Sequence, residues 1–138
     1  MLLSIDDLPE LLDAAKKEGL HERVSDPGAF ARRTRVVLLR HAESGIGIDI
    51  SLGALPFEQE MVARSEVYQL ESLEIRLPTP EDLIIMKAVA HRPKDLLDIQ
   101  GILRSHPNLD RRRIRKWVTQ FAELLEMPEV WDAIADWL

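Results

Sequence analysis

The stretch RVVLLRHAESGIGIDISL, residues 35–52, decides the fold class of this chain. Its first part, Arg35–His41, is rich in β-branched and aliphatic residues and predicts a strand. A turn at Glu43–Gly45 comes next, and Ile46–Leu52 then alternates between large aliphatic and small or polar residues. Alternate residues of a strand point to opposite faces, so four aliphatic side chains lie on one face and Asp49 lies on the other. We therefore expect an antiparallel hairpin that buries one face.

The remaining segments are mostly predicted helices around this hairpin. Apolar spacing and helix-terminal signals place the helices at residues 6–18, 55–65, 80–91, 93–105, 110–126 and 128–138. Residues 21–31 are predicted as a loop, and residues 66–77 as one or two short strands. The expected fold class is α/β (α+β): a small mixed or antiparallel sheet packed by helices, followed by a C-terminal helical part. We expect a single domain, 1–138, with an α/β part at 1–77 and a helical part at 78–138.

Composition places the chain among globular proteins. Of its 138 residues, 46% are apolar and 30% are charged, a balance typical of a folded domain. No apolar run approaches the roughly 20 residues of a membrane helix, and Met1–Glu10 lacks the basic residues of a signal peptide. The sequence has no cysteine, which excludes disulfides, thiolate zinc sites and a cysteine nucleophile. We expect a cytoplasmic location and no membrane partner.

Net charge and short motifs exclude further functions. The formal net charge of −6 disfavours general binding to nucleic acid. His41-Ala42-Glu43 has the H-x-E form of zinc deaminases, but the cysteine ligands of those enzymes are missing. Gly45-Ile46-Gly47 begins like a dinucleotide-binding loop, but Ile50 occupies the position of the third glycine and a strand comes next instead of a helix.

Two charged residues stand in small or apolar surroundings. Asp49 lies mid-strand between Gly47 and Ser51, and these small neighbours leave room for a ligand or for a metal ion with its waters. A solvated sheet face explains the same pattern equally well. Lys87 is the one polar residue of the apolar run Leu83–Ala90, so it must snorkel, find a partner or face a polar cleft. A lysine in such a cleft suits phosphate.

The segment RPKDLLD, residues 92–98, comes directly after this run. Lys94 and Asp98 have the spacing of an ion pair on a helix surface. Asp95 lies near the N-terminus of a predicted helix, where the helix dipole favours an acid. Taken singly, each of these residues has an ordinary structural explanation.

Taken together, these residues form a longer pattern. Ile48-Asp49-Ile50 precedes Pro56-Phe57-Glu58, and the pattern continues with Thr79-Pro80-Glu81-Asp82-Leu83, Lys87 and Arg92-Pro93-Lys94-Asp95-x-x-Asp98. The likeness to a known family extends over nearly the whole chain. The pattern resembles the bacterial nucleotidyltransferase-like proteins of the DNA polymerase beta superfamily, in the branch of AbiEii-type toxins and minimal nucleotidyltransferases.

The resemblance implies a mixed sheet with helices on it, and an activity. Enzymes of this family move a nucleoside monophosphate from a triphosphate to a hydroxyl with magnesium. They hold the metal ions with an Asp-x-Asp or Asp-x-Glu pair on one strand and a third acid on a later strand. By resemblance, Asp49 is this third acid, a catalytic residue and a metal ligand. The resemblance also implies a set of substrate-binding residues with supporting acids: Lys87, Arg92 and Lys94, with Asp95 and Asp98.

The chain departs from the family pattern at its start. The Gly-Ser turn and the Asp-x-Asp strand are missing, and Leu2-Leu3-Ser4 is similar to the segment that comes after that strand in the family. Asp6 and Asp7 are poor substitutes, because adjacent residues of a strand point to opposite faces. We expect either a lost catalytic start or a chain that begins at an internal methionine, with the missing motifs encoded upstream. Residues 1–138 alone are predicted to bind magnesium weakly or not at all, to bind a nucleoside triphosphate weakly, and to transfer no nucleotide.

Further expectations concern partners. A missing strand would leave a sheet edge uncovered, which predicts a homodimer. One alternative function is a non-catalytic interaction module on the same scaffold, such as the protein partner in a toxin–antitoxin-like pair. Another is contact with RNA through the basic cluster Arg111–Lys116, which a steep loss of affinity with salt would reveal. Asp49 and Lys87 are predicted to open onto one shared cleft.

Overall fold

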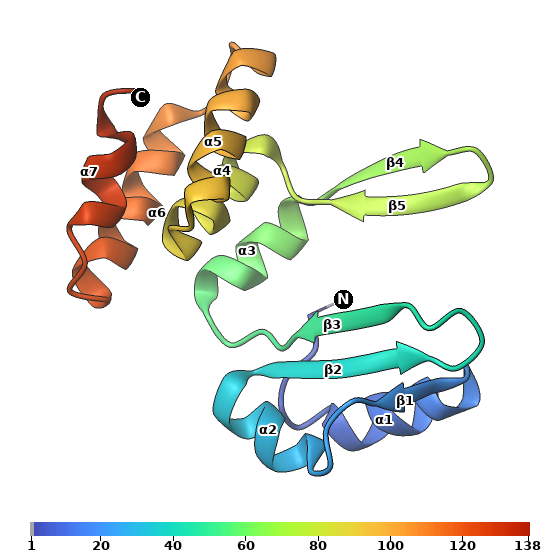
Figure 1. The fold of residues 1–138 in the computed structure, drawn as a ribbon. Coiled ribbons are helices and arrows are strands. Elements are labelled where there is room, and N and C mark those ends of the chain that lie inside the picture. Colours follow the sequence, from blue (N-terminus) through green and yellow to red (C-terminus); the bar gives the residue numbers. More distant parts are fainter. Residues whose placement is uncertain (1) are drawn as a thin grey trace. The chain divides into compact units, whose positions relative to one another are not determined.

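A computed structural model describes residues 2–138 and divides the chain into two compact units. Unit 1 is Met1–Val62 and unit 2 is Ala63–Leu138. Residues 2–138 form seven helices and two small antiparallel sheets, of three and two strands, which confirms the α+β fold class (Figure 1). None of the helices in this part of the chain is long and apolar enough to cross a membrane. The single domain with parts 1–77 and 78–138 stays a prediction.

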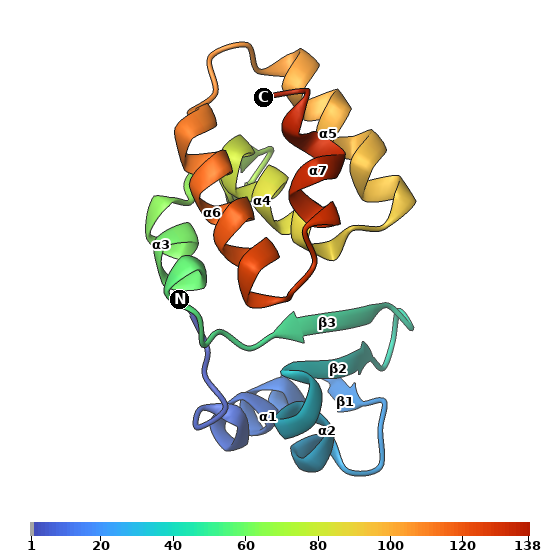
Figure 2. The ribbon, with the colours of Figure 1, turned by 90° about the vertical axis from the view of Figure 1, so that its left-hand side faces the viewer.

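Unit 1 is a three-stranded sheet with two helices on one face. Its elements are α1 (Leu8–Lys17), β1 (Leu20–Glu22), α2 (Pro27–Thr34), β2 (Val36–His41) and β3 (Gly47–Ser51). The strand order is β1-β2-β3, and both neighbouring pairs are antiparallel. Figures 1 and 2 show α1 and α2 on the same side of the sheet. The expected hairpin is therefore confirmed as β2 and β3.

The core of unit 1 lies between this sheet and its helices. Val37 and Leu39 of β2 are each 1% exposed, because they point toward the helices. They pack with apolar side chains from α1, α2 and β3, namely Leu8, Ala15, Ala31, Ile48 and Ile50. Burial of apolar area is the main stabilising term for such a layer. The opposite face of the sheet is mixed, with Val36 and Leu38 of β2 beside Asp49 and Ser51 of β3.

The predicted loop at residues 21–31 is reduced to residues 23–26, because β1 and α2 take up the rest. β1 adds a third strand beside β2, and three residues are too few to show an alternating pattern. α2 begins at Pro27, because proline suits the first helical position and Asp26 caps the helix. The Asp26 carboxylate accepts the backbone N–H of Ala29 at 2.8 Å. The Asp-Pro-Gly sequence therefore starts a helix here and does not form an isolated turn.

Unit 2 combines helices with a two-stranded ribbon. α3 (Pro56–Arg64) spans the boundary between the units. The further elements are β4 (Glu66–Leu70), β5 (Leu73–Leu77), α4 (Pro80–Ala90), α5 (Pro93–Ser105), α6 (Arg111–Leu124) and α7 (Glu129–Ala135). α4 packs against α5, α6 and α7 (Figure 2). Ile84, Ile85 and Ala88 of α4 are inaccessible, as expected for a helix that is apolar on most sides.

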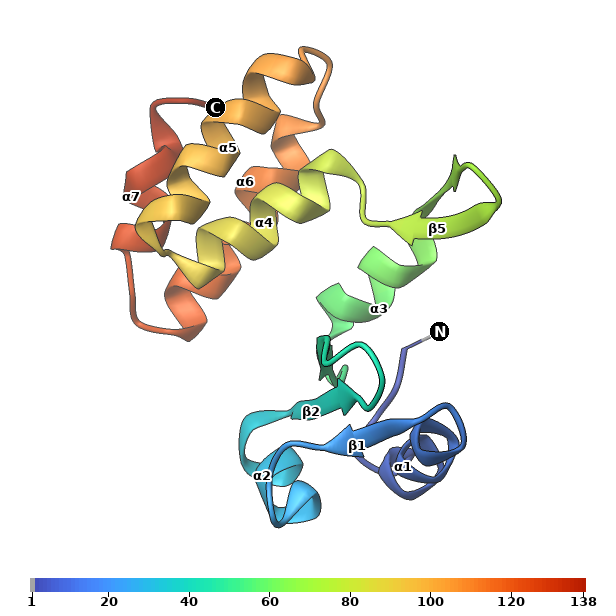
Figure 3. The same cartoon turned by 45° about the vertical axis from the view of Figure 1, so that its right-hand side comes forward.

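The segment before α4 also forms as predicted. β4 and β5 are the expected short strands, and they pair with each other in antiparallel register (Figure 3). α4 then starts at Pro80 with Thr79 as its cap, and the Thr79 hydroxyl accepts the backbone N–H of Asp82 at 3.3 Å. The last four predicted helices are confirmed as α4, α5, α6 and α7.

Candidate functional site

Asp49 lies on the face of the unit 1 sheet that the two helices do not cover. It is opposite Leu38 in β2, whereas the core residue Leu39 is opposite Ile48. Successive residues of a strand point to opposite faces, so Asp49 and Leu38 project away from α1 and α2. The Asp49 side chain is 65% exposed. A carboxylate in this position is accessible to a ligand from solution.

Arg23 occupies the space beside Asp49. It comes directly after β1, its backbone N–H donates to the Leu38 carbonyl at 2.9 Å, and its guanidinium donates to Asp49 Oδ1. A Cβ atom on Gly47 would lie 3.4 Å from Arg23 Nη1, so the glycine leaves room for the guanidinium. The small neighbours of Asp49 therefore accommodate a cation of the chain itself. The sequence pattern did not reveal this partner, because 26 residues separate it from Asp49.

The sheet of unit 1 also carries a basic hollow. Its volume is about 530 Å³, and its lining is His21, Glu22, Arg23, Leu38, Arg40 and Ala42. The Arg40 side chain is fixed by a hydrogen bond to the Gly45 carbonyl at 2.8 Å. Two arginines against one acid, Glu22, make this lining a poor site for a metal ion.

The acids of unit 1 do not fit a magnesium site by themselves. Magnesium in phosphate-transfer sites takes one or two carboxylates together with substrate phosphates. Asp49 supplies one carboxylate, and it is paired with Arg23. Asp7 accepts hydrogen bonds from the Ser4 backbone N–H at 2.7 Å and the Ser4 hydroxyl at 2.9 Å, which lower the pKa of Asp7 and fix the turn before α1. Across residues 2–138, no three acidic or histidine side chains form a group that could hold a metal ion.

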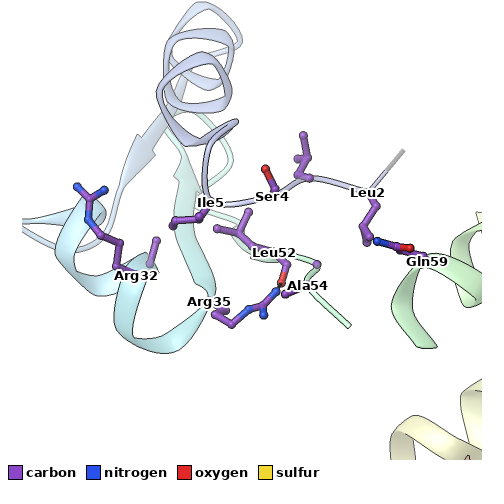
Figure 4. Close-up of a pocket in the computed structure, with 11 residues that line it drawn as sticks. Leu2, Ser4, Ile5, Arg32, Arg35, Leu52, Ala54 and Gln59 are labelled. Atoms are coloured by element: carbon purple, nitrogen blue, oxygen red, sulfur yellow. Dashed lines mark hydrogen bonds between the residues drawn. The ribbon is translucent and has the colours of Figure 1, made fainter. Parts of the chain in front are cut away.

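A second hollow in unit 1 lies beside the end of β3. Its volume is about 580 Å³. A backbone hydrogen bond joins two of its lining residues: the Gly53 N–H donates to the Leu3 carbonyl at 2.7 Å. Figure 4 shows the lining, which includes Leu52 and the arginines Arg32 and Arg35. The described lining has no carboxylate. This hollow therefore offers apolar and cationic contacts and no ligand for a metal ion.

Lys87 in unit 2 finds its partners on the next helix. Its Nζ donates to Asp98 Oδ2 at 2.6 Å and lies 3.6 Å from Asp95 Oδ1. Arg92 binds the same Asp95 through both Nε and Nη2. Asp98 therefore pairs with Lys87 and not with Lys94, which the helical spacing had suggested, and Lys94 is exposed. The structure joins four of the predicted site residues in one network at the corner between α4 and α5.

This network balances its own charges. The hydrogen bond from Arg92 lowers the pKa of Asp95, whose side chain is 1% exposed, and the hydrogen bond to Asp98 raises the pKa of Lys87. Two cations thus face two carboxylates, and a phosphate at Lys87 would have to compete with Asp98. Because Asp49 lies in unit 1 and Lys87 in unit 2, their predicted shared cleft stays a prediction.

Unit 2 contains a buried ion pair that the sequence does not reveal. Asp82 is inaccessible, and its Oδ1 accepts a hydrogen bond from Arg113 Nε at 2.7 Å. Arg64 Nε lies 3.4 Å from the other oxygen of the same carboxylate. The one available signal was an acid three residues after a helix cap, and that spacing is typical of an ordinary helix start. The pair joins α4 to α6.

The basic cluster Arg111–Lys116 is largely used within unit 2. Besides Arg113, three of its members have contacts there: Arg111 donates to a Leu138 oxygen at 2.9 Å, Arg115 lies over the Trp131 ring, and Lys116 lies over the Trp117 ring. A cation over an aromatic face is stabilised by the ring's charge distribution. These contacts lie within unit 2, while Arg111, Arg112, Arg115 and Lys116 stay exposed, and contact of the cluster with RNA stays a prediction.

Comparison with known proteins identifies a family. Residues 4–133 match the sequence model of the family described as nucleotidyl transferase AbiEii toxin, type IV toxin–antitoxin system. The matched range includes every predicted site residue and most of each unit. A search of curated proteins found no match to the chain.

Proposed function

Because the chain belongs to the AbiEii family of nucleotidyl transferase toxins from type IV toxin–antitoxin systems, we propose that it is a nucleotidyltransferase-fold component of such a system. We further propose that residues 1–138 alone transfer no nucleotide. The reaction that the family resemblance implies is transfer of a nucleoside monophosphate from a triphosphate to a hydroxyl. A cytoplasmic location and an antitoxin as the protein partner belong to the same proposal.

The setting of Asp49 is the observation that carries the proposal. Two-metal transfer requires both metal ions to be held across the attacking and leaving oxygens. Asp49, as the proposed third acid, offers one accessible carboxylate on a sheet face, next to the guanidinium of Arg23. One such carboxylate is too few for that arrangement, so no transfer step is assigned to these residues. Magnesium, if it binds this chain, would supply charge neutralisation at the phosphates, with Asp49 as its ligand.

Weak binding of a nucleoside triphosphate is proposed at the corner between α4 and α5. Lys94 is exposed there, and Arg92 and Lys87 lie close to it in the chain. Lysine and arginine are the usual partners of phosphate oxygens. Asp95 and Asp98 hold Arg92 and Lys87 in place and also neutralise them, which is why we expect weak binding.

The test is an incubation of the chain with each α-labelled ribonucleoside triphosphate, with magnesium or manganese, and with bulk tRNA or cell lysate as the acceptor. We expect no transfer of label. Positioning and charge neutralisation supply nearly all of the rate in phosphoryl-type transfer, so loss of a metal clamp costs several orders of magnitude.

Asp49→Asn is the diagnostic variant for this test. Asp13→Asn is its matched control, because Asp13 is an exposed acid of α1 in the same unit. Label transfer that disappears with Asp49→Asn and persists with Asp13→Asn would show that this chain completes its own metal site. The proposed inactivity would then be abandoned.

One observation favours the alternative function of an interaction module. The ribbon of β4 and β5 exposes several large apolar side chains, and exposed apolar patches mark contact surfaces.

A further inference from the structure

The ribbon β4–β5 has one apolar and one polar face. In its register Tyr68 is opposite Ile75, Leu70 is opposite Leu73, and Leu77 is opposite Glu66. These pairs alternate with Val67–Arg76 and Gln69–Glu74, which lie on the other face. The apolar side chains are accessible: Leu70 is 60%, Leu73 61%, Tyr68 46% and Leu77 44% exposed. The ribbon is therefore amphipathic, and its apolar face is largely exposed, with Ile75 half-buried.

Such a ribbon is incomplete as a sheet. A single two-stranded hairpin is marginal in water, and independent stability requires three or more strands with an apolar face or packing against a helix. Each strand of the ribbon has one neighbour only, so among residues 2–138 both outer edges lack a strand partner. An unpaired edge presents backbone N–H and C=O groups that can pair with another strand.

The sequence of β5 indicates which strand would pair with it. Leu73-Glu74-Ile75-Arg76-Leu77 is symmetric about Ile75 in apolar character and complementary in charge. In an antiparallel pair with a second β5, Ile75 would lie opposite Ile75 of the second copy. Glu74 of each copy would then lie opposite Arg76 of the other copy, which gives two such pairs related by the two-fold axis. All apolar side chains of both strands would share one face.

β4 does not have this property. About its central residue, Tyr68, an antiparallel self-pairing would place Val67 opposite Gln69 and Glu66 opposite Leu70. Neither pair is complementary in charge or in apolar character. Opposite charges directly across a ladder stabilise strand pairing, and mismatched pairs do not. The self-complementary edge is therefore that of β5.

We propose that two copies of this chain associate through β5, in antiparallel register about Ile75, to form a four-stranded sheet in the order β4-β5-β5-β4. The interface is isologous, since the same strand of each copy meets its equivalent. Its small size makes the dimer weak, so it forms at high micromolar concentration and dissociates on dilution. This surface differs from the N-terminal sheet edge on which the sequence-based expectation of a homodimer rested.

Charge reversal tests this register. Arg76→Glu and Glu74→Arg each convert two attractive cross-strand pairs of the dimer into two repulsive ones. We expect each single variant to raise the dimer Kd at least roughly tenfold. The double variant Glu74→Arg/Arg76→Glu restores two attractive pairs, so its Kd should return close to that of the unmodified chain. The measurement is sedimentation equilibrium of the full chain over a concentration series.

Arg104→Glu is the matched control, because Arg104 is an exposed arginine of α5 outside the ribbon. Its dimer Kd should be unchanged. The fluorescence of the three tryptophans, all of which lie in unit 2, checks that each variant keeps this unit folded. A monomer at high micromolar concentration would overturn the proposal. A dimer that both single reversals leave intact would remove β5 from the interface, and a double variant that stays monomeric would refute the register. None of these measurements depends on nucleotidyl transfer, so they test the dimer independently of the proposed function.

Discussion

Replacement of Asp82 by leucine tests whether the buried ion pair holds unit 2 together. The Asp82 side chain is inaccessible, and the side chain of its partner Arg113 is 11% exposed. Asp82→Leu leaves the guanidinium in this enclosed position without the Asp82 carboxylate. The helix cap survives, because the Thr79 hydroxyl accepts from the backbone N–H of residue 82 and not from its side chain.

The expected loss is large relative to the stability of the unit. Removal of one partner from a buried ion pair costs about 3–5 kcal/mol. At about 0.05–0.15 kcal/mol per residue, a unit that runs from residue 63 to residue 138 has a total stability of about 4–11 kcal/mol. The variant therefore loses from about a quarter of its free energy of unfolding to all of it. In the double variant Asp82→Leu/Arg113→Met no charge of the pair remains, and the loss should shrink to about 1 kcal/mol or change sign.

Urea unfolding followed by tryptophan fluorescence measures this effect. All three tryptophans lie in unit 2, so the signal reports this unit. Asp132→Leu, a replacement of an exposed acid on α7, is the control and should change the free energy of unfolding by no more than about 0.5 kcal/mol. An Asp82→Leu variant that loses less than about 1 kcal/mol, or a double variant less stable than this single one, would refute the argument.

Two further predictions concern pH and helix capping. The pKa of Asp95 is lowered, so its stabilisation is fully present above pH 3.8, its ordinary value, and is lost as the pH falls through the lower folded-state pKa. The pKa of Lys87 is raised, so its contribution is fully present below pH 10.5 and is lost as the pH rises through the higher folded-state pKa. Urea midpoints over pH should fall at both ends, and Asp95→Asn should flatten the acidic limb; an unchanged limb would contradict the assignment. Thr79→Ala removes the cap of α4 and should cost about 1 kcal/mol in the same assay, whereas an unchanged midpoint would show that the cap contributes nothing.

The elements that were predicted correctly are those whose own residues carry a repeating signal. β3 alternates, and α4 is apolar with a capping threonine and a proline at its start. β1 and α2 were missed for different reasons. β1 is defined only by its pairing with β2, and α2 starts at an Asp-Pro-Gly sequence that is equally typical of a turn.

The sequence indicates which residues are candidates for the site, but it does not indicate the side chains with which they pair. The apolar surroundings of Lys87 predict that it snorkels, finds a partner or faces a polar cleft, and the structure supplies a partner, Asp98, 11 positions away on another helix. The local alternative, Lys94 with Asp98, was visible in the sequence, because i, i+4 spacing is a property of one helix. An interhelical pair depends on the angle at which α4 and α5 meet, and no single segment encodes that angle.

The burial of the ion pairs also indicates which candidate residues are available to bind a ligand. Asp95 is buried and paired with Arg92 and Lys87. Removal of either cation would leave the buried Asp95 carboxylate without full charge compensation, which lowers the free energy of unfolding strongly. Asp49 is 65% exposed, and exposed ion pairs contribute only about 0–1 kcal/mol. A metal ion can therefore replace Arg23 beside Asp49 at little cost, while the Asp95 carboxylate stays bonded to Arg92 and Lys87. On this physical ground Asp49 is the residue suited to bind a ligand, and Asp95 is suited to hold α4 and α5 together.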